Sequence, residues 1–247
     1  MRALRALFLG LCGLMLAACA GTPSPDAPSS YSMAANDPFE AANRDILVLN
    51  KYLDQILIHH TVERYLLLPD GVRRGVHNFL RNLAAPTVFV NDVLQGEPDR
   101  AGETLGRFLI NSTAGIGGVF DRAAAIGVAP HSEDFGQTLA RWGVKEGPFV
   151  MLPLLGPSNP RDAAGLATDV FLLDPTNHIH FKQHFWWAAG RQYLVVLDLK
   201  AQTYETLQGI ERSSVDYYAA LRNLYRQNRA NEIRNGQAAE PADLPDF

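Results

Sequence analysis

The chain has 247 residues, of which 47% are hydrophobic and 19% charged, and its formal net charge at pH 7 is −4. This composition is typical of a globular protein with one large or two small domains. The acidic balance argues against a general nucleic-acid-binding protein, so no nucleic acid is expected among the partners.

The N-terminus has the pattern of a secretory signal peptide over residues 1–18, where Arg2 and Arg5 precede an apolar run too short to span a membrane. The run ends in Leu16-Ala17-Ala18-Cys19, which matches the bacterial lipobox. We therefore expect Cys19 to become the acylated N-terminus. Ala20 follows where an aspartate would signal inner-membrane retention, so we expect an outer-membrane destination. An ordinary signal peptide with a chance cysteine is the alternative.

Processing at this site would leave the mature protein without a thiol, because Cys12 is removed and Cys19 is lipidated. A disulfide, a cysteine-ligated zinc and a cysteine nucleophile are then all excluded. Loss of residues 1–18 also removes two arginines and makes the net charge −6. Residues 19–36 are rich in Pro, Ser and Ala and predict a flexible tether. Residues 236–247 predict a disordered acidic tail, which leaves 37–235 as the folded domain.

The folded domain is predicted to begin with a helix capped by Asp37, with Pro38 at its first position and Glu40 three residues after the cap. Its apolar face is wider than a usual amphipathic stripe, so the helix is either deeply buried or in contact with lipid. The residues that recur on one face are Ile46, Leu49, Leu53, Ile56 and Leu57.

Proline and glycine divide the next part of the chain into short predicted helices. Pro69 precedes one helix, Pro86 opens another that ends near Gly96, and Pro98 opens a third. In that third helix Gly102 and Gly106 are four residues apart, a spacing that permits close helix contact.

The second half of the domain predicts an irregular segment over 122–160 and then further helices. Asn159 and Pro160 have the pattern of a helix cap followed by the first helical residue. Two long helices are expected between Trp186 and Arg234. Because no segment shows convincing alternation, the fold class is mainly α.

The sequence contains partial matches to two kinds of site, a phosphate-binding loop and the nucleophile elbow of a serine hydrolase. Gly115, Gly117 and Gly118 lack the spacing and the lysine of a phosphate-binding loop. A lipase or esterase would need a nucleophile elbow; the nearest match is Gly156-Pro157-Ser158-Asn159-Pro160, where a proline replaces the second glycine. His131 and Asp134 could complete a triad with Ser158 on paper. A hydrolase is therefore an alternative, and we expect no enzyme activity and no catalytic residue.

Histidines and arginines supply two further candidate features. His178, His180 and His184 lie beside Asp174 at a spacing that could hold a metal, but an interfacial segment next to Trp186 and Trp187 is favoured, and no metal is expected. His59-His60 are predicted to end the first helix and to complement its carbonyl dipole. Arg222, Arg226 and Arg229 recur on one face of the last helix, which predicts a solvated basic face or a contact with lipid headgroups or an acidic partner.

Four ordered motifs across residues 37–235 resemble the VacJ/MlaA lipoprotein family. They are Asp37-Pro38-Phe39-Glu40 with Asn43-Arg44; Arg107-Phe108 with Asn111-Ser112-Thr113-Ala114-Gly115-Ile116-Gly117-Gly118 and Asp121; Glu133-Asp134-Phe135-Gly136-Gln137-Thr138-Leu139 with Trp142-Gly143; and GPFVMLPLLGPSNPRD at 147–162. The resemblance implies a single helical domain, ring-like or disc-like, seated in the inner leaflet of the outer membrane.

The same resemblance implies a function without a cofactor, in which phospholipid is the transported ligand. Mislocalised phospholipids would be removed from the outer leaflet through an amphipathic channel and passed to a soluble periplasmic carrier, beside a trimeric porin. Candidate lipid-path residues are Asn43, Arg44, Asn50, Asn111, Ser112, Thr113, Gly115, Gly117 and Gly118. For Asn43, Arg44 and Asn50 structural hydrogen bonding is an equal alternative. Bulk at Gly117 or Gly118 is expected to disturb transport more than folding. The rival class is a structural lipoprotein that organises porins.

Overall fold

The computed structural model describes residues 36–178, 184–235 and 237, and these form one predominantly helical domain. The mainly α class is thereby confirmed. The signal segment, Cys19, His180, nearly all of the predicted tether and all of the predicted tail except residue 237 lie outside the described residues. Among the described helices, none combines the length and the apolar character needed to cross a bilayer.

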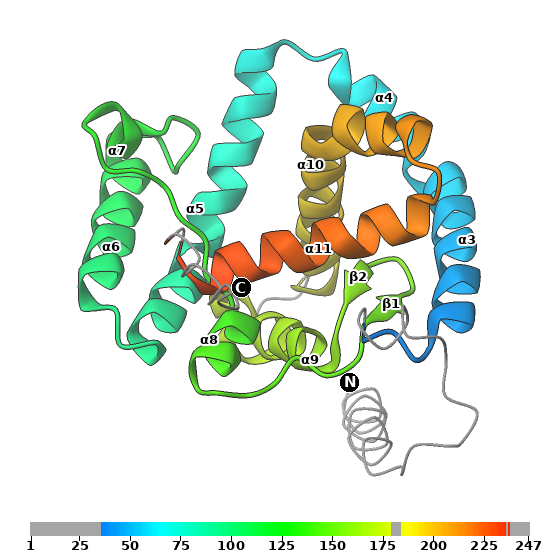
Figure 1. Cartoon of the computed structure of the whole chain (residues 1–247). Helices are drawn as coiled ribbons and strands as arrows, with labels where there is room; N and C mark the ends of the chain where they lie inside the picture. Colours follow the sequence, from blue (N-terminus) through cyan, green and yellow to red (C-terminus); the bar gives the residue numbers. More distant parts are fainter. Residues whose placement is uncertain (1–35, 179–183, 236, 238–247) are drawn as a thin grey trace, which may run out of the picture.

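The helices and strands follow one another with short connections (Figure 1). The first group is α3 (Glu40–Leu57), α4 (His59–Leu66), α5 (Asp70–Leu94), α6 (Pro98–Thr113), α7 (Arg122–Ala125) and α8 (Phe135–Arg141). The second group is β1 (Val150–Leu152), β2 (Gly156–Ser158), α9 (Pro160–Thr168), the π-helix η2 (Asp169–Leu173), the 3-10 turn η3 (Pro175–His178), α10 (His184–Ser213) and α11 (Tyr217–Ile233).

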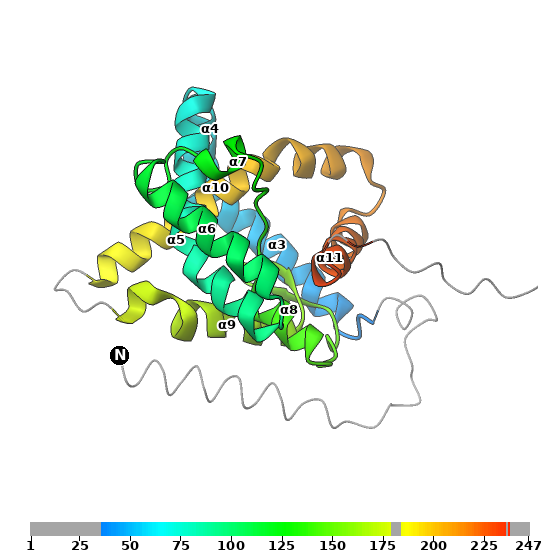
Figure 2. The ribbon, with the colours of Figure 1, turned by 90° about the vertical axis from the view of Figure 1, so that its left-hand side faces the viewer.

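The arrangement is disc-like, with long helices around the edge and the last helix crossing one face. In Figure 1, α3 and α4 lie on one side, α5 and α6 on the other, and α8 and α9 between them at the bottom. Helix α11 crosses in front of α10. Figure 2, turned by 90°, shows α5 and α6 side by side, with α8 and α9 beneath them.

The start of the domain differs from the predicted cap. Helix α3 begins at Glu40, and Phe39 occupies the cap position without a side-chain hydrogen bond. Asp37 is instead fully buried, where its carboxylate accepts hydrogen bonds from Asn43 (2.9 Å), the Tyr218 hydroxyl (2.5 Å) and Arg222 (2.8 Å). Charge-assisted bonds of this kind are stronger than the bond from a neutral backbone amide at a helix cap. Asp37 therefore binds its distant partners instead of capping α3.

Several helix boundaries also differ from the sequence expectations. Pro86 lies inside α5, which continues through it. The proline costs local hydrogen bonding, whereas α5 is held by packing against α6, α8 and α10. His59 and His60 begin α4 instead of ending the first helix, so the dipole argument was wrong. Gly102 and Gly106 have no atom of another element within 4 Å of a Cβ position, so they do not form a close helix contact.

The segment 122–160 is more ordered than predicted. It contains α7, α8 and an antiparallel hairpin in which Met151 pairs with Pro157. The strands have only three residues each, too short for alternation to be recognised in the sequence. The predicted start of α9 is confirmed: Asn159 is the N-cap, its side chain accepts a hydrogen bond from the Asp162 amide (2.8 Å), and Pro160 is the first helical residue.

Buried apolar residues form two small clusters. One joins α4 to α10 through Ile58, Val62, Tyr65 and Leu197. The other joins the hairpin to α11 through Phe149, Met151 and Tyr218. Between α8 and α9 the backbones touch directly, since a Cβ on Gly165 would collide with the backbone of Gly136.

Buried polar residues outnumber buried apolar residues in the described part of the chain. Arg229 of α11 is the centre of the largest polar cluster. Its guanidinium donates to both carboxylate oxygens of Asp134 (2.6 and 2.7 Å) and of Asp162 (2.9 and 3.0 Å). Burial opposes the charged forms of Asp134 and Asp162, but the bonds from Arg229 outweigh it and lower the pKa of both carboxyls.

The predicted basic stripe on the last helix therefore has a different role. Arg222 pairs with Asp37, Arg229 with Asp134 and Asp162, and Arg226 with Glu146 at 2.9 Å. Arg222 and Arg229 are both buried. The periodicity correctly placed these arginines on one face, but that face packs against the domain, with Arg222 and Arg229 buried and Arg226 about one-third exposed. Contact of Arg226 with a headgroup stays a prediction.

Large apolar side chains are abundant on the surface. On α3 they include Val48, Leu49, Tyr52, Ile56 and Leu57, each 45–67% exposed. Others follow on α6, on η2 and at the start of α10, where Trp186 is 75% exposed. Of the two expectations for the first helix, deep burial is thus wrong: within the part of the chain that the structure describes, this apolar face is exposed.

The Arg229 cluster predicts a large loss of stability when its cation is removed. Arg229→Gln leaves the Asp134 carboxylate without its cationic partner and Asp162 with Arg161 alone, so the free energy of unfolding should fall by about 3–5 kcal/mol. Urea unfolding followed by circular dichroism measures this change. Arg212→Gln is the matched control, because Arg212 is exposed and, among the described residues, bonds Gln208 of its own helix alone. It should change stability by less than about 0.5 kcal/mol. Equal effects would contradict the assignment.

Asp169 predicts a specific pH dependence of stability. Burial raises the pKa of this carboxyl to about 6, although it accepts hydrogen bonds from the Phe135 amide (2.8 Å) and from Asn91 (3.0 Å). Because the folded state holds the proton more tightly than the unfolded chain, this contribution to stability is present below about pH 4 and is lost as pH rises through 6.

The measurement compares wild type with Asp169→Asn between about pH 4 and pH 7. The stability of wild type relative to the variant should fall by on the order of 1–3 kcal/mol across this range. Asp45→Asn, at an exposed position of α3, is the control and should show a flat difference. A flat difference for Asp169→Asn as well would disprove the assignment.

Candidate functional site: a polar cavity between α5 and α6

The candidate site is built from the end of α6 and the turn that follows it. Helix α6 stops after Thr113, and residues 114–120 fold back through hydrogen bonds from the Gly118 amide to the Asn111 carbonyl (2.8 Å) and from the Phe120 amide to the Gly115 carbonyl (2.9 Å). Gly117 and Gly118 have φ angles of +68° and +96°, which favour glycine. The turn brings Asp121 back beside α6.

Gly118 is required for a second reason, since a Cβ there would collide with the side chain of Asn82 on α5. Gly115 is equally confined, because its Cβ would collide with the carbonyl groups of Asn111 and Phe120. Gly117 faces open space. Gly115 thus closes the turn against the end of α6, and Gly118 brings the turn against α5. The prediction that they line a lipid path stays a prediction.

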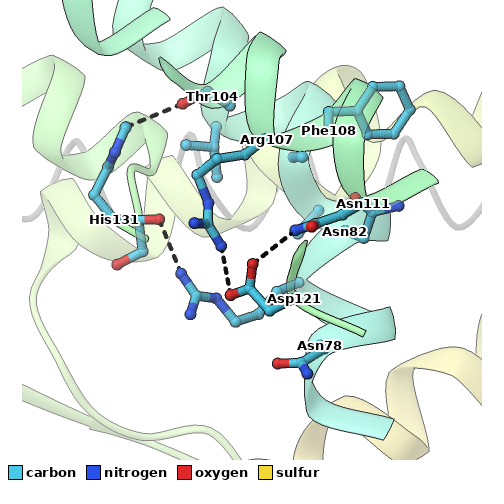
Figure 3. Close-up of a pocket in the computed structure, with 13 residues that line it drawn as sticks. Asn78, Asn82, Thr104, Arg107, Phe108, Asn111, Asp121 and His131 are labelled. Carbon is cyan, nitrogen blue, oxygen red and sulfur yellow. Dashed lines mark hydrogen bonds and ion pairs between the residues drawn. The ribbon is translucent and has the colours of Figure 1, made fainter. Parts of the chain in front are cut away.

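A cavity of about 100 Å³ lies between α5, α6 and the segment that follows the turn (Figure 3). Exposed Ala84 and Ser132 lie on its rim. Most of the residues that line it are polar or charged: Asn78, Arg81, Asn82, Thr104, Arg107, Asn111, Asp121 and His131, with Ala85, Val88 and Phe108 as apolar members. Apolar atoms nevertheless make up the larger part of the surface that faces the cavity.

One wall is a bonded triad that fixes Asp121. Arg107 donates to its Oδ2 at 2.7 Å, and Asn111 donates to its Oδ1 at 3.0 Å; Figure 3 shows both pointing toward it. The same carboxylate caps α7 by accepting from the Ala124 amide. Burial opposes the charge of Asp121, yet the amide and the arginine together lower the pKa of its carboxyl.

The opposite wall contains His131, whose Nε2 lies 3.0 Å from the Thr104 hydroxyl and 3.2 Å from each carboxylate oxygen of Asp92. Thr104 in turn donates to Asp92 at 2.6 Å. Asp92 is fully buried, and Arg100 approaches it at 3.8 Å while binding Glu133 at 2.5 Å. The buried carboxylate of Asp92 is therefore held by Thr104 and His131 and shares one arginine with Glu133.

The remaining predicted residues at this end of α6 make internal hydrogen bonds. The hydroxyl of Ser112 accepts from Asn82 at 2.9 Å, and that of Thr113 donates to the Leu109 carbonyl at 2.7 Å. Asn111 is buried and lines the cavity, whereas Thr113 is exposed. Of the three proposed headgroup donors, Asn111 is thus the one that the structure places at the cavity.

Asn43, Arg44 and Asn50 form a separate group on α3, across the molecule from α6 in Figure 1. Asn43 donates to the Phe149 carbonyl (3.1 Å) and accepts from the Met151 amide (2.9 Å), and Asn50 likewise bonds the backbone of residues 152 and 154. Arg44 binds Asp216, which raises the pKa of the guanidinium. These side chains attach α3 to the hairpin and to α11; a role in a lipid path stays a prediction.

The residues of the hypothetical hydrolase triad are occupied in other interactions. The hydroxyl of buried Ser158 donates to the Asn159 carbonyl, His131 contacts Asp92 and Thr104, and Asp134 binds Arg229. Ser158, His131 and Asp134 therefore do not form the catalytic arrangement that a nucleophilic serine requires. The predicted cluster at His178, His180 and His184 lies outside the residues whose side chains are described.

Sequence reasoning missed Arg81 and His131 as members of the cavity. Arg81 belongs to a helix other than the glycine-rich motif, and His131 was considered only as a partner of Ser158. Arg107 and Asp121 were part of the quoted motif without being assigned a role. No local pattern could have joined these four, because the contacts between them depend on how α5 packs on α6.

The fold and the cavity define a single-domain helical protein with a polar interior and an extensive apolar surface. Comparison with known proteins gives its family: the model of the MlaA lipoprotein family matches residues 35–232. The chain belongs to the MlaA lipoprotein family. This confirms the resemblance carried by the four motifs.

Relatives and a solved structure agree with this assignment. The chain is 31% identical to the intermembrane phospholipid transport system lipoprotein MlaA of Escherichia coli K12, covering 98% of this chain and 92% of the relative. The Haemophilus influenzae protein of that name is 28% identical, with 85% of each chain covered. A structure from work on the structural basis for maintenance of bacterial outer membrane lipid asymmetry superposes with a TM-score of 0.69 at 30% identity, covering 80% of this chain and 98% of that one.

The turn predicts that Gly118 is needed for folding. Gly118→Ala combines an unfavourable positive φ with a collision against Asn82, so it should lower the free energy of unfolding by about 1–3 kcal/mol. This reverses, for Gly118, the expectation that bulk disturbs transport more than folding. Gly102→Ala, on the exposed side of α6, is the control and should stabilise by about 0.5–1 kcal/mol. Thermal unfolding distinguishes them, and an unaffected Gly118→Ala would contradict the geometry.

Proposed function

We propose that this protein is an outer-membrane lipoprotein that takes mislocalised phospholipids from the outer leaflet and passes them toward a soluble periplasmic carrier. Membership of the MlaA lipoprotein family and the transport function in the names of its relatives support this proposal. The single observation that carries it is the distribution of polarity, with polar side chains inside and large apolar side chains outside.

This distribution has a physical explanation if part of the surface contacts lipid tails. Contiguous apolar surface of this extent is uncommon on monomeric soluble proteins and marks an interaction surface. The exposed face of α3 and the aromatic start of α10, with Phe185, Trp186 and Trp187, are suited to the hydrocarbon and headgroup levels of one leaflet. Acyl chains on Cys19 would hold the domain there.

Movement of a phospholipid between leaflets requires a polar route for its headgroup, because an unpaired charge in hydrocarbon is costly. The polar interior supports such a route through the helical body. No cofactor and no catalytic step are part of the proposal. A trimeric porin beside the apolar surface would shield the rest of that surface from lipid.

The main alternative is a lipoprotein that organises porins without moving lipid. The test is transfer of a fluorescent phospholipid from vesicles containing the full-length acylated protein to a soluble acceptor protein. Transfer above the protein-free rate, without release of fatty acid, supports transport. Co-purification with a porin without transfer would favour the structural alternative. Fatty-acid release that disappears in Ser158→Ala would favour the hydrolase.

The α3 face gives a specific prediction for this assay. Val48→Glu combined with Ile56→Glu places two charges on side chains that are 67% and 60% exposed, so the fold should persist while contact with lipid tails is lost. We expect the transfer rate to fall at least about tenfold, since burying one such side chain contributes about 1.5–3 kcal/mol. Val215→Glu is the control, because Val215 is exposed between Ser214 and Asp216, and it should transfer like wild type. Unchanged transfer by the double variant would contradict a lipid-facing α3.

A further inference from the structure

Arg81 is the one charged group on the wall of the α5–α6 cavity whose charge is not balanced by a carboxylate in contact with it. Within the described part of the chain its guanidinium makes no ion pair, and its single hydrogen bond is a long one to the His131 carbonyl at 3.4 Å. A guanidinium carries five N–H donors, so most of those of Arg81 are left for another partner.

The other charges of the cavity are already paired. Among the lining residues, Arg107 and Asp121 neutralise each other at 2.7 Å. Behind the lining, Asp92 contacts His131 and shares Arg100 with Glu133. Burial, and next the positive charge of Arg107, lower the pKa of Arg81, whereas Asp121 opposes this effect from a distance. The charged residues that line the cavity, Arg81, Arg107 and Asp121, thus leave one positive charge unpaired in a partly desolvated place, which is unfavourable until an anion compensates it.

The size and donors of the cavity indicate which anion fits. About 10–15 Å³ of such space is enough for one water, so about 100 Å³ accommodates a tetrahedral oxyanion. A guanidinium binds phosphate oxygens through two parallel N–H bonds. Ser132 places a hydroxyl at the rim, where a further oxygen could accept from it. One uncompensated cation matches the single charge of a phosphodiester better than a dianion.

We propose that the α5–α6 cavity is a binding site for a phosphodiester group, with Arg81 as its principal ligand. Two sources share this chemistry: the headgroup phosphate of a phospholipid and a small free phosphate. The lipid source rests on the proposed function, because only a protein in contact with phospholipid would present a headgroup to this cavity. The site itself, as an anion site, does not depend on transport.

Binding is tested on the full-length protein by calorimetry with three water-soluble probes: dimethyl phosphate, glycerophosphoethanolamine and inorganic phosphate. Wild type should bind the two diesters, and Arg81→Gln should weaken binding at least about tenfold, since hydrogen bonds to a charged group contribute about 1.5–3 kcal/mol. Arg74→Gln is the matched control, because it removes the same charge from an exposed position of the same helix, and it should bind within about twofold of wild type.

A second readout guards against loss of the fold. Arg81→Gln removes an under-compensated cation, so its melting temperature without ligand should equal or exceed that of wild type, while glycerophosphoethanolamine should raise the melting temperature of wild type alone. Arg81→Lys keeps the positive charge but loses the two parallel N–H donors of the guanidinium, so it should bind the diesters with intermediate affinity.

The outcomes distinguish a lipid headgroup from a free phosphate as the ligand, and they distinguish failure of the anion site from failure of the proposed lipid transport. Binding of inorganic phosphate but of neither diester would overturn the headgroup source and leave a free-anion site. Equal binding by wild type and Arg81→Gln, or no binding of any probe by wild type, would overturn the site. If wild type transfers phospholipid but binds no probe, the inference fails while the proposed function stands. If it binds diesters that require Arg81 but transfers nothing, the anion site stands without transport.

Discussion

The attachment of α11 by buried arginines is the interaction on which the rest of the structure depends. Arg222 reaches Asp37 at the start of the domain, and Arg229 reaches Asp134 and Asp162 at the starts of α8 and α9. One helix thereby joins three segments that are distant in the sequence. Buried pairs of this kind contribute little net stability compared with apolar packing, but each is expensive to break, so they enforce one arrangement.

This constraint follows from where the apolar residues lie. A domain with many of its large apolar side chains on the surface has few left for its interior, and its two apolar clusters are small. The helices must then be held together by hydrogen bonds and ion pairs in which each buried donor, acceptor or charge finds a partner. The Asp121 triad, the Asp92–His131–Thr104 wall and the Arg229 cluster are three instances of the same solution.

A polar interior of this kind also has a functional consequence. Side chains and amides that are already fixed in hydrogen bonds reorganise little when a charged group enters, so under the proposed function the cost of receiving a headgroup would largely be met during folding. The cavity beside Arg81 is the place where this interior retains unused donors. The apolar outside and the polar inside are therefore complementary halves of the proposed lipid transport, one for the acyl chains and one for the headgroup.

The sequence by itself determined what depends on local order along the chain. The Asn159-Pro160 cap, the Pro98 start of α6, the two long C-terminal helices and the family motifs were all recognised because capping, proline geometry and helical periodicity act within a few residues. Only the tertiary structure decided which partner each polar group found. Asp37 binds Arg222 instead of capping a helix, Arg222 and Arg229 of α11 are buried, and the charge of Arg107 on α6 acts on Arg81 of α5. Periodicity shows that residues share a face, but the energy of a charged side chain is set by what packs against that face, and such contacts are made between segments far apart in the chain.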